Sequence, residues 1–226
     1  MFIKNNSSFL TVPEHREIAM TSTRPELPRE FVASHKRRRM MDAIASLTAE
    51  KTYEATKIAD IVRSAAVARK TLYDNFDGKE DLFLSAIDSA MSDMRMVVEE
   101  ACAQNTGSAE DGIVAGIAAL LDYIADHPAA ARMCMVEAIS ATPSSARLYD
   151  AGMHDFVELL RKGAPQDVDL PETIEESLVG GVSWILQQQI RRGEAERAAD
   201  LLPELSQFVL SPYPGVGKVG GPGRRK

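Results

Sequence analysis

The stretch Thr56–Lys79, TKIADIVRSAAVARKTLYDNFDGK, decides the fold of this chain. Its first part places Ile58 and Ile61 on one face of a short helix. Residues 66–68 are small enough for a second helix to cross the first closely. That second helix, from about residue 69 to 75, buries Leu72 and leaves its other side chains to solvent. Two short helices joined by a tight turn predict a helix-turn-helix, whose second helix can enter the major groove of DNA.

The polar residues of the stretch divide by the contacts that we expect them to make with DNA. The exposed start of the second helix carries the candidates for base edges, which are Arg69, Lys70 and Thr71. Other groups are expected to meet phosphates, and Thr56 is also the expected N-cap of the first helix. These phosphate candidates are Arg37, Arg38, Thr56, Lys57, Tyr73, Asn75 and Lys79. For Tyr73 the sequence leaves a second role open, as a half-buried ring packed on the first helix.

The same residues carry a resemblance to a known family. Thr71-Leu72-Tyr73, Phe76, Lys79-Glu80 and Leu82 are similar to the signature of the tetracycline-repressor (TetR) family of bacterial regulators, over roughly residues 36–87. The chain departs from that pattern in three places. Ala66 stands where a turn glycine is usual, Ala68 replaces a capping serine or threonine, and Asn75 replaces a frequent histidine. An alanine cannot accept the capping hydrogen bond, which costs about 1 kcal/mol.

Composition fits this resemblance. The chain has 226 residues, 45% of them hydrophobic, which is enough for a substantial core. Helical periodicity dominates, so we expect an all-α fold: a three-helix DNA-binding domain joined by a long helix to a helical ligand-binding and dimerisation domain. The predicted divisions are a flexible arm at 1–30, the DNA-binding domain at 31–80, the effector domain at 81–211 and a disordered basic tail at 212–226. Before the motif we expect one helix, at about 34–50. After it we expect helices at about 79–105, 110–126, 128–141, 144–162, 171–192 and 195–210.

Charge is divided unevenly along the chain. The formal net charge is −7, which is unusual for a protein that binds DNA. Residues 1–83 carry 14 Lys and Arg against 12 Asp and Glu, whereas residues 84–211 carry 8 against 21. The acidic part repels DNA, so we expect the molecule to approach DNA with its N-terminal end.

The second domain is interpreted mainly through the resemblance. TetR-like proteins pair through their last two helices and enclose a small ligand among the central ones, so we expect a homodimer and an unknown small-molecule effector. The candidate ligand-binding residues are Tyr123, Met133, Met135, His154, Phe156, Trp184 and Gln188. Each of these side chains has the alternative role of ordinary core or surface packing. A dimer also suits DNA, because two half-sites need two recognition helices.

Other functions find little support in the sequence. No phosphate loop, nucleophile elbow or paired metal-ligand spacing is present, so we expect no enzyme activity, no cofactor and no metal. No apolar run is long enough to span a membrane and no secretory signal is visible, so we expect a cytoplasmic protein. The expected function is transcriptional regulation, as a repressor that a ligand releases from a palindromic operator. Two alternatives stay open: a module that has lost specific DNA recognition, and a redox-responsive regulator that uses Cys102 and Cys134.

Overall fold

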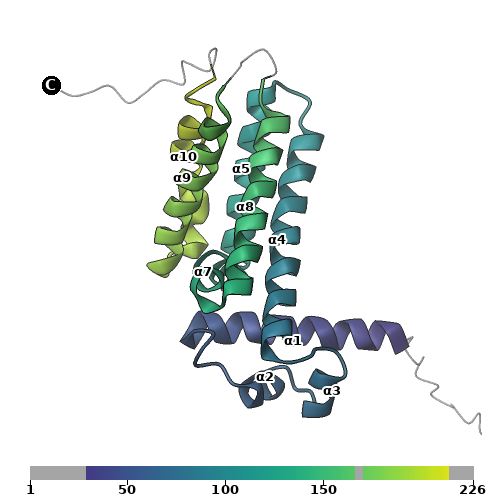
Figure 1. Ribbon diagram of the computed structural model, residues 1–226. Helices are drawn as coiled ribbons and strands as arrows, with labels where there is room; N and C mark the ends of the chain where they lie inside the picture. The colour runs from purple at the N-terminus through teal and green to yellow at the C-terminus, as the bar shows by residue number, and fades with distance from the viewer. Residues whose placement is uncertain (1–28, 166–169, 214–226) are drawn as a thin grey trace, which may run out of the picture.

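The computed structural model describes residues 29–165 and 170–213, and every regular element in those ranges is helical. The expected all-α architecture is therefore confirmed (Figure 1). Most of the predicted N-terminal arm and basic tail lies outside the described residues.

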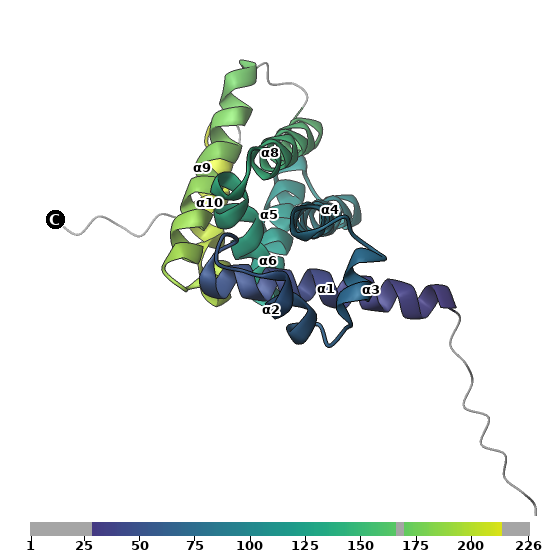
Figure 2. The same ribbon diagram turned by 60° about the horizontal axis from the view of Figure 1, so that its bottom comes forward.

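Three helices form the N-terminal end of the molecule: α1 (Arg29–Lys51), α2 (Ile58–Ser64) and α3 (Arg69–Tyr73). In Figure 1, α1 runs across the base of the upright bundle, and the short α2 and α3 lie beneath it. Figure 2 brings this end forward and shows α3 at the surface, far from the last two helices. The long α4 (Lys79–Gln104) rises from the three-helix unit into the bundle.

The remaining elements stand beside α4. They are α5 (Ala109–Asp126), α6 (Pro128–Arg132), the π-helical segment η1 (Met133–Glu137), α7 (Ala138–Ala141), α8 (Pro143–Gly163), α9 (Glu172–Arg191), the 3₁₀ segment η2 (Ala195–Leu201) and α10 (Leu202–Leu210). Helices α4, α5, α8, α9 and α10 run roughly alongside one another, as Figure 1 shows.

Local sequence explains where the bundle helices begin. Ser108 caps α5: its Oγ accepts a hydrogen bond from the Asp111 backbone N–H, and the Asp111 carboxylate accepts one from the Ser108 N–H. Thr142 caps α8 in the same reciprocal way, with Pro143 in the first turn. These caps satisfy backbone donors that an isolated helix end leaves without partners.

One hydrophobic core joins the DNA-binding end to the bundle. The cluster of buried side chains runs without a break from α1, α2 and α3 through α4 into α5, η1 and α9. Phe83 is fully buried, and its ring centroid lies 4.4 Å from that of Tyr53. The predicted boundary at residue 80 therefore cuts a continuous core. Helical spacing of apolar residues along α4, from Leu82 to Met94, forms a stripe that is buried.

Several local expectations differ from the structure. Thr56 is buried and does not cap α2, which begins after Lys57. The expected helix at 128–141 contains the π-helical turn of η1, and the expected helix at 195–210 begins as the 3₁₀ segment η2. Tyr213, assigned to the disordered tail, is buried in a smaller core cluster with Val209 and Leu210. Packing around each segment, which periodicity does not register, causes these differences.

Within the described ranges, no single helix is long and apolar enough to cross a membrane; α5 together with Pro128–Ala141, bent by 104°, meets the same criteria of length and composition as a pair.

Candidate DNA-binding surface and ligand cavity

The turn between α2 and α3 is set by an unusual backbone conformation. Ala66 has a φ of 49°, in the left-handed region that glycine adopts without strain. The Arg39 guanidinium from α1 donates to the carbonyls of both Ala65 and Ala66 and so holds the turn. Ala68 occupies the N-cap position of α3 and provides no side-chain acceptor. Ala66 and Ala68, two of the three departures noted in the sequence, therefore leave the turn without a glycine and without a side-chain cap. The guanidinium of Arg39 supports the turn.

The outer side of α3 presents polar groups to solvent. Arg69 and Lys70 are exposed, and Tyr73 keeps 47% of its surface accessible. The Arg69 guanidinium lies 5.8 Å from the centre of the Tyr73 ring, while the Lys70 ammonium is 3.9 Å from the Asp74 carboxylate. Both contacts are at the surface and contribute little energy, so these cations are available to a partner. Leu72, by contrast, is fully buried, as expected.

Arg37 was predicted to meet a phosphate, but its guanidinium is turned into the protein. One nitrogen donates to the Asn75 backbone carbonyl at 2.9 Å and another to the Ser85 Oγ at 3.1 Å. The guanidinium carbon also lies 4.1 Å from the centre of the Phe76 ring. Arg37 therefore fixes the exit of α3 against α1 and α4.

Lys79 and Thr56 likewise have internal partners. The Lys79 ammonium donates to the backbone carbonyls of Tyr53 and Thr56 at 3.0 and 3.1 Å and lies 4.0 Å from the centre of the Tyr53 ring. Partial burial lowers the Lys79 pKa from its ordinary value. The Thr56 hydroxyl donates to the Thr52 carbonyl at 2.8 Å. Both side chains stabilise the loop before α2 instead of facing outward as the sequence suggested.

The other predicted DNA contacts differ in how exposed they are and in whether they have partners within the protein. Lys57 is exposed at the start of α2, and Arg38 is exposed in an ion pair with Asp42 at 3.3 Å. Thr71 is half-buried, and the Asn75 amide donates to the Thr71 carbonyl at 2.7 Å. The exposed members of the predicted set are therefore Arg38, Lys57, Arg69, Lys70 and Tyr73.

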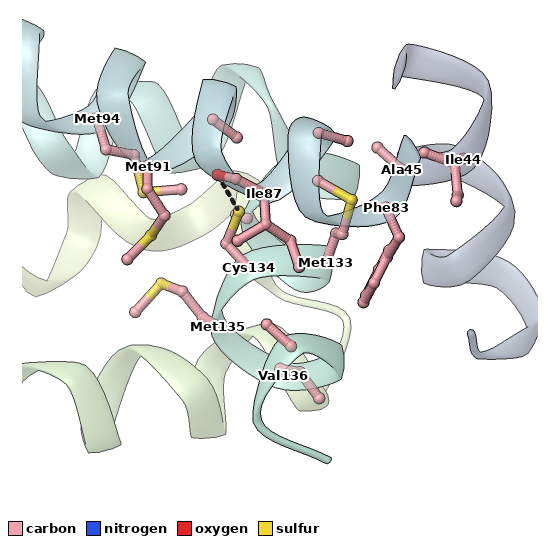
Figure 3. Close-up of a cluster of buried hydrophobic side chains, with 14 of the residues drawn as sticks. Ile44, Ala45, Phe83, Ile87, Met91, Met94, Met133, Cys134, Met135 and Val136 are labelled. Carbon is pink, nitrogen blue, oxygen red and sulfur yellow. Dashed lines mark hydrogen bonds between the residues drawn. The ribbon is translucent and has the colours of Figure 1, made fainter. Parts of the chain in front are cut away.

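A cavity of about 110 Å³ lies inside the bundle, between α4, α5, α8, α9 and η1. Its lining is almost entirely apolar and includes four methionines, Met91, Met94, Met135 and Met153. Figure 3 shows Met91 of α4 and Met135 of η1 pointing toward one another. Flexible thioether side chains suit a cavity that adapts to its contents.

Two of the predicted ligand residues, Met135 and Phe156, line this cavity. The others lie elsewhere. Tyr123 packs edge-on against His127, at 4.5 Å between ring centroids, and Met133 is buried in the main core. His154 is exposed, as is 62% of Trp184, and Gln188 is half-buried away from the lining. These residues share a region of the chain with the cavity but face other directions.

A sequence pattern does indicate some of the cavity-lining residues that the predicted ligand-binding set left out. Met91, Met94, Val98 and Cys102 line one wall, and they continue the apolar stripe of α4 at helical spacing. Gly116 of α5 faces this wall, where a Cβ atom would lie 2.8 Å from the Cys102 Sγ. The apolar spacing beyond residue 91 indicates that this face of α4 is buried. It does not indicate that part of the face lines a cavity.

The N-terminal helices of the chain match a known protein family. The family model of bacterial regulatory proteins of the tetR family matches residues 40–86, which span most of α1, the two motif helices and the start of α4. Over these residues the chain is similar to TetR-family regulators.

Individual relatives agree with this assignment. The HTH-type transcriptional regulator YezE from Bacillus subtilis (strain 168) is 32% identical over 110 residues, which cover 45% of this chain and 54% of that protein. The present chain thus spans about half the length of this curated relative. The matched proteins are transcriptional regulators, not enzymes.

Solved structures share the fold at low sequence identity. The fatty acid degradation regulator FadR from Bacillus halodurans superposes with a TM-score of 0.68 at 17% identity, covering 76% of this chain and 97% of its own. FadR from Bacillus subtilis gives 0.66 at 16% identity, with 77% and 98% covered. A TetR-like regulator from Rhodococcus sp. RHA1 gives 0.62 at 20%, with 82% and 98% covered.

The two cysteines of the chain are free thiols. Cys134 is fully buried, and its Sγ lies 3.8 Å from the Ile87 carbonyl, the contact marked in Figure 3. Burial raises the pKa of both thiols. Because the thiolate is the reactive form, both sites are poorly suited to redox sensing. Among the described residues, no group of three or more His, Cys, Asp and Glu side chains is placed to hold a metal ion.

The outer face of α9 is partly apolar. Trp184 is the most exposed large hydrophobic residue described, and 39% of Phe208 on α10 is also accessible. A Cβ atom at Gly181 would lie 2.8 Å from the Phe208 ring, so the two helices touch at this point. At Gly180, one position before it, a Cβ atom would meet nothing within 4 Å.

Proposed function

We propose that this protein is a sequence-specific transcriptional repressor of the bacterial cytoplasm, which binds a palindromic operator as a homodimer and leaves it when a small apolar molecule fills the cavity. The observation that carries the proposal is the exposed face of α3 in a TetR-family helix-turn-helix. Arg69, Lys70 and Tyr73 stand there without strong internal partners.

Arg69, Lys70 and Thr71 are the proposed base-reading residues, because they begin the helix that enters the major groove. An Arg or Lys that bonds guanine O6 and N7 discriminates against the wrong base by about 1–3 kcal/mol. Tyr73, Lys57 and Arg38 are the proposed phosphate contacts. The internal hydrogen bonds of Arg37, Lys79 and Thr56 give these three residues a supporting role instead.

Selection of bound sequences from a random DNA pool tests this part at a stated salt concentration. We expect an enriched palindrome for the wild type, a relaxed base preference for Lys70→Ala, and uniformly weaker binding for Tyr73→Phe. Weak binding to all sequences alike, with no enriched motif, would favour the alternative of a module that has lost specific recognition.

The proposed dimer uses α9 and α10, the last two helices. Trp184 and Phe208 provide apolar surface there, and Gly180 permits close approach of a second backbone. Burial of the indole in a symmetric interface explains why so large an apolar side chain stands on the outer face.

The proposed ligand is apolar because the cavity lining is apolar. FadR from Bacillus subtilis, which shares the fold, was solved in complex with stearoyl-CoA. A hydrocarbon group suits the cavity of the present chain, but at about 110 Å³ its unexpanded space is small. An engineered protein cavity of roughly 150 Å³ holds one benzene molecule, so a ligand longer than this must displace the lining methionines.

Two elements connect the cavity to the DNA-binding end. Helix α4 carries Met91 and Met94 at the cavity and Phe83 in the core shared with α1, so displacement of the methionines acts on the base of the same helix. The second element is η1. Met135 lines the cavity, and two residues later the Glu137 carboxylate accepts a hydrogen bond from the Tyr53 backbone N–H at 3.1 Å.

A tilt of α4 would change the distance between the two recognition helices of the dimer. A coupling of about 1–3 kcal/mol corresponds to an operator affinity roughly 5–150-fold lower in the presence of ligand. The test is operator binding with and without a compound that raises the melting temperature. A compound that stabilises the protein and leaves operator affinity unchanged would contradict release by ligand.

A further inference from the structure

The cavity wall carries a single hydroxyl group. Besides glycines, the lining consists of hydrophobic side chains, Cys102 and Ser183. The Cys102 thiol donates to the Gly112 carbonyl at 3.4 Å. Ser183 is 6% exposed and comes from α9, facing α8. A buried hydroxyl in an otherwise apolar wall requires hydrogen-bond partners, because a buried polar group without them is costly.

Ser183 has two such partners in the protein. Its Oγ lies 2.6 Å from the Tyr149 hydroxyl oxygen, and the Gln187 amide nitrogen donates to the Tyr149 and Ser183 oxygens at 2.9 and 3.2 Å. The three groups join α8 to α9 at the edge of the cavity. The Gln187 side chain acts as donor in both of its bonds.

The hydroxyl protons of Tyr149 and Ser183 are not all used within this group of three side chains. Each hydroxyl group carries one proton and two acceptor lone pairs. Only one of the two hydroxyl protons is used in the bond between Tyr149 and Ser183. A phenol is the stronger acid of the two, so Tyr149 is the better donor and Ser183 the acceptor. Neither hydroxyl donates to another group among the hydrogen bonds of the described residues, which leaves the Ser183 proton for an acceptor inside the cavity.

We propose that the cavity takes an uncharged, mainly hydrocarbon ligand with one carbonyl oxygen, which accepts a hydrogen bond from the Ser183 hydroxyl. This inference rests on the proposed ligand-binding function and adds the chemical class of the ligand and its polar anchor. An ionised ligand group is disfavoured, because the lining provides no opposite charge and burial of an unpaired charge is costly. The hydrocarbon part lies against Met91, Met135 and Phe156.

The test uses two probes of nearly the same shape, acetophenone and isopropylbenzene, which differ in a carbonyl oxygen against a methyl group. Affinities for wild type and Ser183→Ala are measured by titration calorimetry, and circular dichroism confirms that the variant folds. We expect Ser183→Ala to bind acetophenone about three- to tenfold more weakly, as loss of one hydrogen bond implies, and isopropylbenzene as tightly as before. Ser183→Cys, which keeps the shape but donates weakly, should lose a similar factor.

Three outcomes would overturn the inference: equal weakening of both probes, no change in either, or no binding of either probe to the wild type. Equal weakening would mean that Ser183 only shapes the wall. None of these results bears on operator binding, which the selection experiment measures separately on the unliganded protein. Failure of the ligand assignment and failure of the DNA-binding proposal are therefore distinguishable.

Discussion

Replacement of Ala66 by glycine is expected to stabilise the protein, which is unusual for a substitution to glycine. Ala66 adopts a φ of 49° in the turn between α2 and α3. The left-handed conformation costs an L-residue about 1–2 kcal/mol, and glycine avoids this cost. Glycine also gives the unfolded chain more freedom, which opposes the gain by about 0.4–1 kcal/mol. The net expectation is a gain of roughly 0.5–1 kcal/mol in the free energy of unfolding.

Ala59 provides a matched control. It is exposed on α2, in the same three-helix unit, and has no positive φ. The same substitution there should destabilise the protein by about 1 kcal/mol, the usual difference between alanine and glycine inside a helix. The two variants are thus expected to differ from wild type in opposite directions.

Thermal unfolding followed by circular dichroism measures the difference at one fixed protein concentration, because formation of the proposed dimer would make the melting temperature depend on concentration. For a chain of this length, 1 kcal/mol corresponds to roughly 2–4 °C. We expect Ala66→Gly to melt above wild type and Ala59→Gly below it. Equal destabilisation by both substitutions would refute the argument, since it would mean that Ala66 carries no conformational strain.

Three further predictions follow. Trp184→Glu should convert the proposed dimer to a monomer in light-scattering measurements and abolish tight operator binding; a variant that remains dimeric would contradict the proposed interface on α9. The Lys51 ammonium at 2.7 Å, followed by the Lys57 N–H, lowers the pKa of Asp60 from its ordinary value of 3.8. Its stabilising contribution is therefore fully present above that ordinary value and is lost as the pH falls through the lowered pKa of the folded state. Asp60→Asn should therefore show a shallower loss of melting temperature between about pH 5 and pH 3, and an unchanged slope would argue against the pair. Lys79→Met should cost about 1 kcal/mol of stability, because two carbonyls lose their donor, yet keep the salt dependence of operator affinity; a slope reduced by about one would restore the phosphate contact predicted from sequence.

The sequence alone determined the helix-turn-helix and the all-helical fold. These features depend on residues close together in the chain: apolar side chains three and four positions apart, and a buried Leu72. Interactions of this kind join residues that are close together in the chain. They can therefore be recognised from a single sequence. The buried stripe along α4 follows the same helical spacing.

The tertiary structure alone decided which polar and apolar groups are available to partners. Arg37 and Lys70 are both cations near the motif, but Arg37 meets Asn75 and Ser85, residues at least 38 positions away. Met133 and Met135 are two positions apart on η1, yet only Met135 borders the cavity. The direction of a side chain within a bundle depends on helix crossings and on the π-helical turn, which are set by packing between distant segments. The sequence determined which groups the protein possesses, and the packing of its helices determined which of them DNA or a ligand can reach.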